Sequence, residues 1–278
     1  MANSNSRKPL KGHSPLTILI PWRLVLRLVG LFLRPAVPLL FLLADSAPTG
    51  YYSTDIGEQL PLRLRGTLLT LNTNSRISVR DSQGCLGVRV FQGEVLFHVE
   101  HGDGNARCLE VRADETLISD IGTTFDVYLT DGRVTVTVID GAVELARAGA
   151  KPSAFDQSSL AVVLQQGDRG EVRRGSSAWR PTIQRLEMSR ILSDISWERG
   201  ELIFDSNSLQ DIVQQFNRYN RRPQIEIQDP SIGSLKMTGI FQLHDPQSFL
   251  AGLQSVEPRV RVMRTDSPDG DIILSMRR

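Results

Sequence analysis

Most of the chain between residues 51 and 173 alternates apolar and polar residues with a period of two. The runs Arg76–Arg80 and Val134–Val138 show this alternation most clearly. Because successive side chains of a β-strand point to opposite faces of its sheet, a half-buried strand produces this pattern. Turn sequences such as Asp131-Gly132 separate the runs, and glycine supplies the positive φ of tight hairpins. These features predict an all-β domain over residues 48–175, a sandwich, barrel or roll of about ten short strands.

A different pattern follows a connector at residues 176–196. Apolar residues recur at the i, i+3, i+4 and i+7 positions of an amphipathic helix, namely Leu209, Ile212, Val213 and Phe216. A second helix is expected to start at Asp245-Pro246, a cap residue followed by proline. Strands are predicted over residues 201–204, 224–228, 235–241, 259–263 and 271–275. The order predicts a small α+β domain, βαββαββ, over residues 197–278, in a chain that is mainly β.

The first 50 residues carry six basic side chains and one acidic side chain, which leaves 26 basic and 30 acidic residues in the rest of the chain. A mildly acidic body lacks the concentrated basic face that nucleic-acid binding requires. We expect a short basic cytoplasmic segment at residues 1–22. Residues 23–47 are largely apolar, although Arg34 interrupts them, and are expected to be a transmembrane anchor or a cleaved signal, with a buried segment as the third alternative. The anchor, which we favour, predicts a single-pass protein of the cytoplasmic (inner) membrane with its bulk in the periplasm.

The two cysteines, Cys85 and Cys108, both fall in predicted strands of the exported part. A disulfide requires Cα atoms within about 7 Å, and nothing in the sequence fixes the register of these strands. We therefore favour two separate, half-buried thiols over a disulfide.

Motifs of catalysis and nucleotide binding are absent from the sequence: it has no nucleophile elbow, zinc-protease, Walker or dinucleotide-binding motif. His98 and His101 stand three residues apart and would point to opposite faces of a strand, which argues against a shared metal ion. No pair of carboxylates has sequence support as an acid–base couple. We predict a protein that is not an enzyme and that binds no metal or cofactor.

A series of short motifs, in order from about Tyr51 to Leu274, resembles the FecR family of sigma-factor regulators. The matching segments are Thr54–Glu58, Leu71–Ser75, Gly93–Val99, Ile121–Val127, Val134–Leu145, Leu164–Asp168, Trp197–Phe204 and Phe216–Tyr219. None of these motifs is decisive by itself, and the resemblance depends on their order along the chain.

The resemblance implies a transmembrane regulator of the anti-sigma type, acting on an extracytoplasmic-function sigma factor. Such a protein relays a signal from an outer-membrane TonB-dependent receptor, often one for ferric siderophores. Its C-terminal module resembles the short N-terminal signalling domains of secretins and TonB-dependent receptors, and is expected to contact the signalling domain of the receptor. The chain departs from the family at residues 1–22, which stand where a longer, tryptophan-rich cytoplasmic segment is usual. Whether this chain binds the sigma factor directly therefore depends on a cytoplasmic segment that is much shorter than is usual in the family.

The expected receptor contacts lie in the C-terminal module. Trp197 is expected to be a packing anchor or an exposed partner-binding residue, and Leu209 and Phe216 belong either to the core or to an interface. The last strand is our candidate for a free sheet edge that pairs with the receptor domain. Its residues are Asp271, Ile272, Ile273, Leu274 and Ser275.

The Gly122-Thr123 bond is a candidate for self-cleavage, because some members of the family that this chain resembles break themselves at the Gly-Thr bond of this motif. The Thr123 hydroxyl would attack the carbonyl carbon of Gly122 and form an ester that hydrolyses more easily than the amide. The alternative, which we favour, is a glycine turn that Thr123 caps before a strand.

Two other functional classes remain as alternatives. One is a periplasmic ligand- or glycan-binding β scaffold without sigma-factor contact, because a fold does not fix a function. The other is a surface-acting hydrolase, which the absence of a visible catalytic constellation disfavours.

Overall fold

The structure, a computed structural model, describes residues 43–44, 49–82, 84–99, 108–120, 122–149, 161–175, 179–265 and 271–276. All of these residues belong to one compact unit, Phe41–Arg278. The segments predicted at residues 1–22 and 23–47 lie outside the described residues, apart from the two-residue strand β1 (Leu43–Ala44). Within the described residues, every helix is too short or too polar to cross a membrane.

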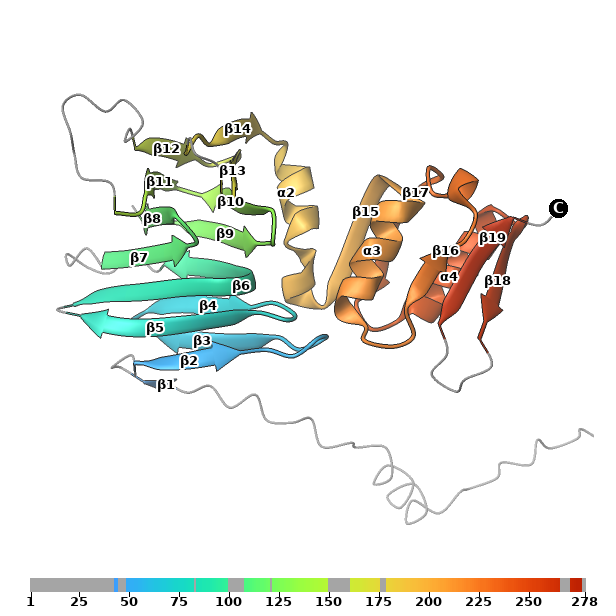
Figure 1. Ribbon diagram of the computed structural model, residues 1–278, viewed down its shortest axis with the longest axis horizontal. Coiled ribbons are helices and arrows are strands. Elements are labelled where there is room, and N and C mark those ends of the chain that lie inside the picture. The colour runs from blue at the N-terminus through green and yellow to red at the C-terminus, as the bar shows by residue number, and fades with distance from the viewer. Residues whose placement is uncertain are drawn as a thin grey trace, which may run out of the picture. The chain divides into compact units, whose positions relative to one another are not determined.

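The β domain consists of two sheets that share one long strand, so that the predicted sandwich or roll is confirmed (Figure 1). The first layer contains β1, β3 (Leu60–Leu64), β4 (Thr67–Leu71), the second half of β6 (Cys85–Val99), β9 (Thr124–Leu129), β10 (Arg133–Asp140), β13 (Asp168–Arg173) and β14 (Thr182–Arg185). The second layer contains β2 (Gly50–Ser53), β5 (Arg76–Ser82), the first half of β6, β7 (Cys108–Ala113), β8 (Thr116–Asp120), β11 (Ala142–Arg147) and β12 (Val162–Gln165).

Strand β6 passes from one layer to the other at Gly93. Residues 85–92 pair with β5, and residues 95–99 pair with β4. Gly93 has a φ of 85°, and a Cβ atom at this position would lie 2.2 Å from Oγ of Ser75. Only glycine therefore fits this bend without moving the backbone of its neighbour.

The core of the β domain lies between the two layers. Residues Val95, Phe97, Phe125 and Val127 point inward from β6 and β9 and are fully buried, and the rings of Phe97 and Phe125 stack at 4.8 Å. The alternation that predicted the strands thus places one set of side chains in the core. The other set of the same two strands lies on the outer face of the first layer.

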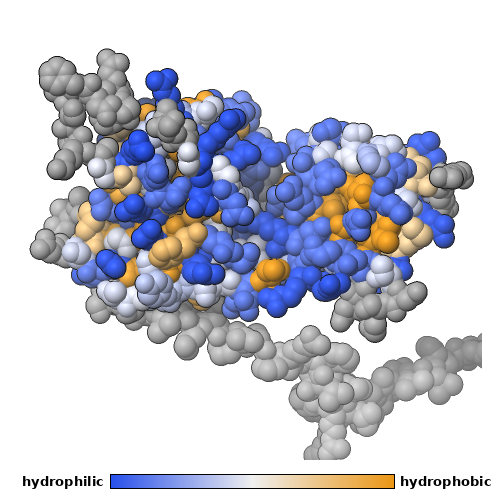
Figure 2. Space-filling model, viewed as in Figure 1, coloured by the Kyte–Doolittle hydropathy of each residue, from blue (hydrophilic) through white to orange (hydrophobic). Residues whose placement is uncertain are grey.

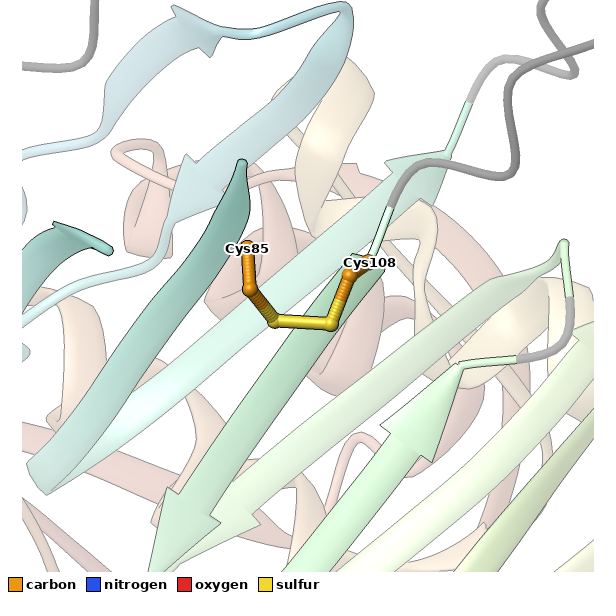
Figure 3. Close-up of a disulfide and its surroundings, with 2 residues drawn as sticks. All are labelled: Cys85 and Cys108. Atoms are coloured by element: carbon orange, nitrogen blue, oxygen red, sulfur yellow. A yellow bond between two sulfur atoms is a disulfide. The ribbon is translucent and has the colours of Figure 1, made fainter. Parts of the chain in front are cut away.

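The structure joins Cys85 and Cys108 in a disulfide, so our preference for two separate thiols was wrong (Figure 3). Strands β6 and β7 are parallel neighbours, and their register puts Cys85 directly opposite Cys108. The two Cα atoms are 4.5 Å apart, well within the reach of a disulfide. The register comes from pairing between strands, which the sequence pattern alone does not reveal.

Replacing both cysteines with serine is expected to lower the free energy of unfolding by about 3 kcal/mol. The disulfide closes a loop with a sequence separation of 23 residues, and removing it restores the entropy of that loop to the unfolded chain. Urea denaturation of the purified chain measures the effect. A reductant should lower the unfolding midpoint of the wild type and leave the double variant unchanged; equal midpoints with and without reductant in the wild type would contradict the prediction.

The C-terminal module has the predicted order βαββαββ. Its elements are β15 (Glu201–Ser208), α3 (Leu209–Tyr219), β16 (Ile225–Ile227), β17 (Lys236–Gln242), α4 (Pro246–Val256), β18 (Val260–Arg264) and β19 (Ile272–Met276), with a short 3₁₀ helix, η4 (Pro230–Ile232), before β17. Ser208 caps α3 by accepting a hydrogen bond from the Asp211 amide, and Asp245 caps α4 in the same way. The module has its own core, in which the rings of Phe216 and Phe249 stack at 4.8 Å.

The last strand is not a sheet edge, which corrects our prediction for Asp271–Ser275. Strand β19 lies in the middle of the three-stranded sheet β16-β19-β18, parallel to β16 and antiparallel to β18. Both of its hydrogen-bonding edges are therefore occupied. A central position follows from the parallel crossover between β16 and β19, a long-range pairing that a short apolar run does not specify.

The segment between the two cores is partly integrated into the β domain. Strand β14 adds to the edge of the first layer beside β13, and Trp179 is buried in the core of the β domain. Helix α2 (Met188–Asp194) and the 3₁₀ helix η3 (Ser196–Arg199) then lead into β15.

Candidate functional site

The outer face of the first layer carries the side chains that meet the C-terminal module. In the antiparallel pairing of β6 and β9, Glu94 lies opposite Tyr128, Leu96 opposite Asp126, and His98 opposite Thr124. Because their neighbours at positions 95 and 97 face the core, this second set must point outward. Strand β10 extends the same face with Thr135 and Thr137, and β13 extends it with Glu171 and Arg169.

A buried ion pair joins this face to helix α3. Nη2 of Arg218, in the last turn of α3, donates to Oε2 of Glu94 at 2.6 Å, and the two side chains are 17% and 8% exposed. Asn72 donates from Nδ2 to the same carboxylate and to the Tyr219 hydroxyl, the latter at 2.8 Å. We call Asn72, Glu94, Asp126, Arg218 and Tyr219 the junction cluster.

The Arg218 side chain is held from several directions. Its guanidinium carbon lies 4.3 Å from the centre of the Tyr128 ring, a cation–π contact. Burial by itself lowers the pKa of Arg218, but the neighbouring Glu94 carboxylate more than reverses this effect, and the pKa is raised. Burial also raises the pKa of the Tyr219 hydroxyl. The guanidinium is therefore charged, and it forms an ion pair with Glu94.

Asp126 is a second carboxyl group beside Glu94. It is 5% exposed, and it shares a side-chain hydrogen bond with Glu94. Burial raises its pKa well above the usual range, the Glu94 charge adds to this effect, and Arg218 and Arg169 oppose it. Two adjacent buried carboxyl groups do not both ionise readily, and the raised pKa of Asp126 favours its neutral form beside Glu94.

Replacing Asp126 with asparagine is expected to stabilise the protein increasingly as the pH rises from about 4 to about 8. A folded-state pKa above the unfolded value of about 3.9 means that folding takes up a proton, so stability is lost as the pH rises toward the folded pKa. Asparagine keeps a donor toward Glu94 and does not ionise. Urea midpoints at pH 4, 6 and 8 measure the difference between variant and wild type, with Asp131→Asn in an exposed turn as the control for the loss of a carboxylate. A difference that does not change with pH would refute the prediction.

Further contacts join the two cores around the junction cluster. Leu96, on the outer face, is fully buried in the core of the C-terminal module. Nε2 of Gln59 donates to the Trp197 carbonyl oxygen at 2.6 Å, and Nε2 of His98 lies 3.2 Å from Oε1 of Glu198. The pair His98 and His101 lies partly outside the described residues, because His101 is not among them, and within the described residues no group of three or more His, Cys, Asp or Glu side chains could hold a metal ion.

Most of the predicted partner-binding residues are core residues, so of the two alternatives for Trp197, Leu209 and Phe216 the structure supports the core. Five of them are at most 2% exposed: Trp197, Leu209, Phe216, Ile272 and Leu274. Their apolar side chains fill the space between the helices and sheets of the module, because that burial stabilises this small domain. Ile273 is half-buried, and Asp271 forms an ion pair with Arg222.

Gly122 and Thr123 lie at the start of β9. Gly122 has a φ of 88°, and Thr123 is 2% exposed, with its carbonyl oxygen accepting a hydrogen bond from the Val99 amide at 2.9 Å. The nearby imidazole of His98 contacts the hydroxyl of the following residue, Thr124, at 3.2 Å. These positions fit the capped glycine turn, and self-cleavage stays a prediction.

The junction cluster was not among the predicted site residues. A signal was present, because Glu94 directly precedes the apolar run Val95–Phe97 and Asp126 stands between the apolar residues Phe125 and Val127. Buried carboxylates need a partner. The partner Arg218 stands 124 residues from Glu94, and no local pattern connects the two.

Three comparisons with known proteins bear on this fold. Residues 50–144, which include β2–β10 and the first residues of β11, match the family model described as FecR protein. Two crystal structures of a proposed anti-sigma factor from Parabacteroides distasonis, at 2.50 and 1.65 Å resolution, each share 18% sequence identity with this chain and a TM-score of 0.59. The matches cover 83% and 82% of this chain and all of the other. No curated protein matches the chain.

The β domain therefore carries the FecR motif set on a fold that also occurs in a proposed anti-sigma factor. At this identity the structural match establishes the fold alone.

Proposed function

We propose that this chain is a transmembrane signal transducer of the anti-sigma type. It relays a signal from an outer-membrane TonB-dependent receptor, of the kind that transports ferric siderophores, to an extracytoplasmic-function sigma factor. The FecR match over residues 50–144 is the observation that carries the proposal, and the fold shared with a proposed anti-sigma factor supports it.

The relay requires a link between the receptor-contacting module and the rest of the chain. The junction cluster supports such a link, because the module docks on the β domain through an ion pair and hydrogen bonds as well as through Leu96. Polar contacts between domains exchange with water more readily than a large apolar interface does. A partner that binds the module can therefore alter this docking.

The proposed contact with the receptor domain lies on β17, in place of the buried β19. Strand β17 pairs with β15 on one side, and Ile240 on this strand is 63% exposed. Figure 2 shows an apolar area over the C-terminal module within a largely hydrophilic surface. An unpaired strand edge beside exposed apolar side chains suits the addition of a strand from a partner.

Replacing Ile240 with glutamate is expected to weaken binding of the isolated receptor signalling domain by about tenfold or more, without loss of stability. Titration calorimetry with the purified chain measures the affinity. Val163→Glu is the matched control, because Val163 is 49% exposed on β12, an edge strand of the β domain. Equal affinity of the Ile240 variant and the wild type would remove β17 as the contact.

Sigma-factor binding and topology are tested separately. Co-expression of the full chain with the sigma factor encoded beside its gene should give a complex that copurifies from membranes. Reporter fusions at Gly132 and Ser206 should be active in the periplasm only. Cytoplasmic activity at either position would overturn the proposed topology, and absence of the complex would overturn direct binding of the sigma factor.

Self-cleavage at Gly122-Thr123 is a further part of the proposal, although the positive φ of Gly122 is one that glycine adopts without strain. Cleavage would give a fragment with Thr123 at its N-terminus. Thr123→Ala should leave one intact band, whereas Thr124→Ala should still be cut. Equal processing of the Thr123 variant would eliminate the hydroxyl attack.

A further inference from the structure

A cleft of about 860 Å³ lies beside the junction cluster. One wall is the outer face of β9, β10 and β13, with Asp126, Tyr128 and Thr137. The other wall is formed by α2, η3, β15 and α3. A volume of this size falls in the range of small-molecule sites.

Two side chains that line the cleft each carry a buried polar atom without a hydrogen-bond partner among the residues that the structure describes. The two atoms are Oδ1 of Asp126 and Nε1 of Trp197, in side chains that are 5% and 2% exposed. Buried polar atoms are almost always hydrogen-bonded, because leaving one unpaired loses its solvation without compensation. The carboxyl oxygen Oδ1 of Asp126 can accept a hydrogen bond, whereas the Trp197 indole N–H can only donate one.

Most charges on the walls are paired within the described residues, and the one lining carboxylate outside these pairs beside the Glu94–Asp126 pair, that of Asp211, accepts a hydrogen bond from the Ser208 hydroxyl at 2.6 Å. All four arginines that line the cleft form ion pairs: Arg218 with Glu94, Arg133 with Glu171, and both Arg169 and Arg190 with Asp194. An anionic ligand would have to break one of these pairs, and a cationic ligand would find one unpaired carboxylate, that of Asp211, already hydrogen-bonded to Ser208. The arrangement therefore favours a neutral ligand.

Groups that donate and accept hydrogen bonds make up much of the remaining surface. Hydroxyl and amide side chains lie on both walls, among them Thr135, Asn207 and Gln214, and Phe204 and Tyr128 contribute aromatic rings. A ligand that suits this lining carries many groups that both donate and accept, as well as some apolar C–H surface. Sugar hydroxyls and ring faces have this chemistry. A peptide suits this lining less well, because it has only one amide group for every three backbone atoms and is usually charged.

We propose that the cleft is a binding site for a short neutral oligosaccharide, in which ligand hydroxyl groups donate to Oδ1 of Asp126 and accept from Nε1 of Trp197. The inference does not depend on the proposed relay to a sigma factor. A sugar bound here contacts both the β domain and the C-terminal module, and therefore stabilises their docking.

The test titrates the purified full chain with maltotriose, cellotriose and diacetylchitobiose at up to millimolar concentration. Binding is followed by tryptophan fluorescence and calorimetry. Glucuronic acid, glucosamine and triglycine serve as charged-sugar and peptide comparisons. We expect at least one neutral saccharide to bind and the three comparison ligands not to bind. Failure of all three neutral saccharides, or binding of triglycine alone, overturns the proposal.

Variants then locate the site. Trp197→Phe removes the indole donor and Asp126→Leu removes the acceptor, and each is expected to weaken binding about tenfold or more. Asp126→Asn keeps an acceptor and a donor and should bind the saccharide like the wild type. Comparing it with Asp126→Leu shows whether weaker binding comes from the lost hydrogen bond or from a less stable protein. Trp179→Phe is the matched control, because that buried indole donates to Thr116 in the core of the β domain. Equal affinity of the Trp197→Phe variant and the wild type contradicts the placement.

Discussion

Replacing Arg218 with methionine is expected to lower the free energy of unfolding by about 3–5 kcal/mol. The substitution leaves the Glu94 carboxylate, 8% exposed, without its cation and next to the second carboxyl group of Asp126. Removing one partner of a buried ion pair has a large effect because the other charge stays buried and uncompensated. Urea denaturation followed by circular dichroism measures the change.

Two further variants show that the effect comes from the ion pair. The double variant Glu94→Gln, Arg218→Met removes both charges and should recover most of the lost stability. Arg222→Met is the matched control, because Arg222 is 63% exposed and its pair with Asp271 should contribute at most about 1 kcal/mol. Additive effects of the two single substitutions would show that Glu94 and Arg218 are not coupled.

Replacing Leu96 with alanine is the second substitution with a large expected effect, a loss of about 2–5 kcal/mol. Leu96 belongs to the β domain but is fully buried in the core of the C-terminal module. Truncating it removes buried apolar surface and leaves a cavity where the two parts meet. The loss should appear in urea denaturation as a lower midpoint.

Leu192→Ala supplies the control for this experiment. Leu192 lies on α2 and is 44% exposed, so its truncation should change the free energy of unfolding by no more than about 0.5 kcal/mol. A Leu96 variant that is as stable as this control would mean that the C-terminal module does not pack on the outer face of β6.

The same two substitutions separate docking from the proposed receptor contact. Arg218→Met and Leu96→Ala alter the surface between the module and the β domain, whereas Ile240 lies on β17. If receptor binding acts through docking, the first two variants should change sigma-dependent transcription while the isolated receptor domain still binds. Ile240→Glu should abolish both.

The elements of the protein were predictable because their signals are local. The period-two alternation of Val134–Val138 gives one strand face to the core and the other to the outer surface, whatever the strand pairs with. The spacing of Leu209 and Phe216 predicts helix α3, and the caps at Ser208 and Asp245 predict where α3 and α4 begin. Each of these signals involves only a few neighbouring residues. The order of elements and the mainly β class followed from such signals.

The pairing of those elements was decided by the tertiary structure. The register between β6 and β7 brought Cys85 beside Cys108, and the parallel pairing of β16 with β19 placed the last strand in the centre of its sheet. The interior of the module enclosed Trp197, whose exposure the sequence left open. The pair of Glu94 and Arg218 spans 124 residues. Hydrophobic periodicity predicts which face of a strand or helix a side chain occupies. The residue that it contacts on that face depends on packing between segments far apart in the sequence, and no local pattern encodes that packing.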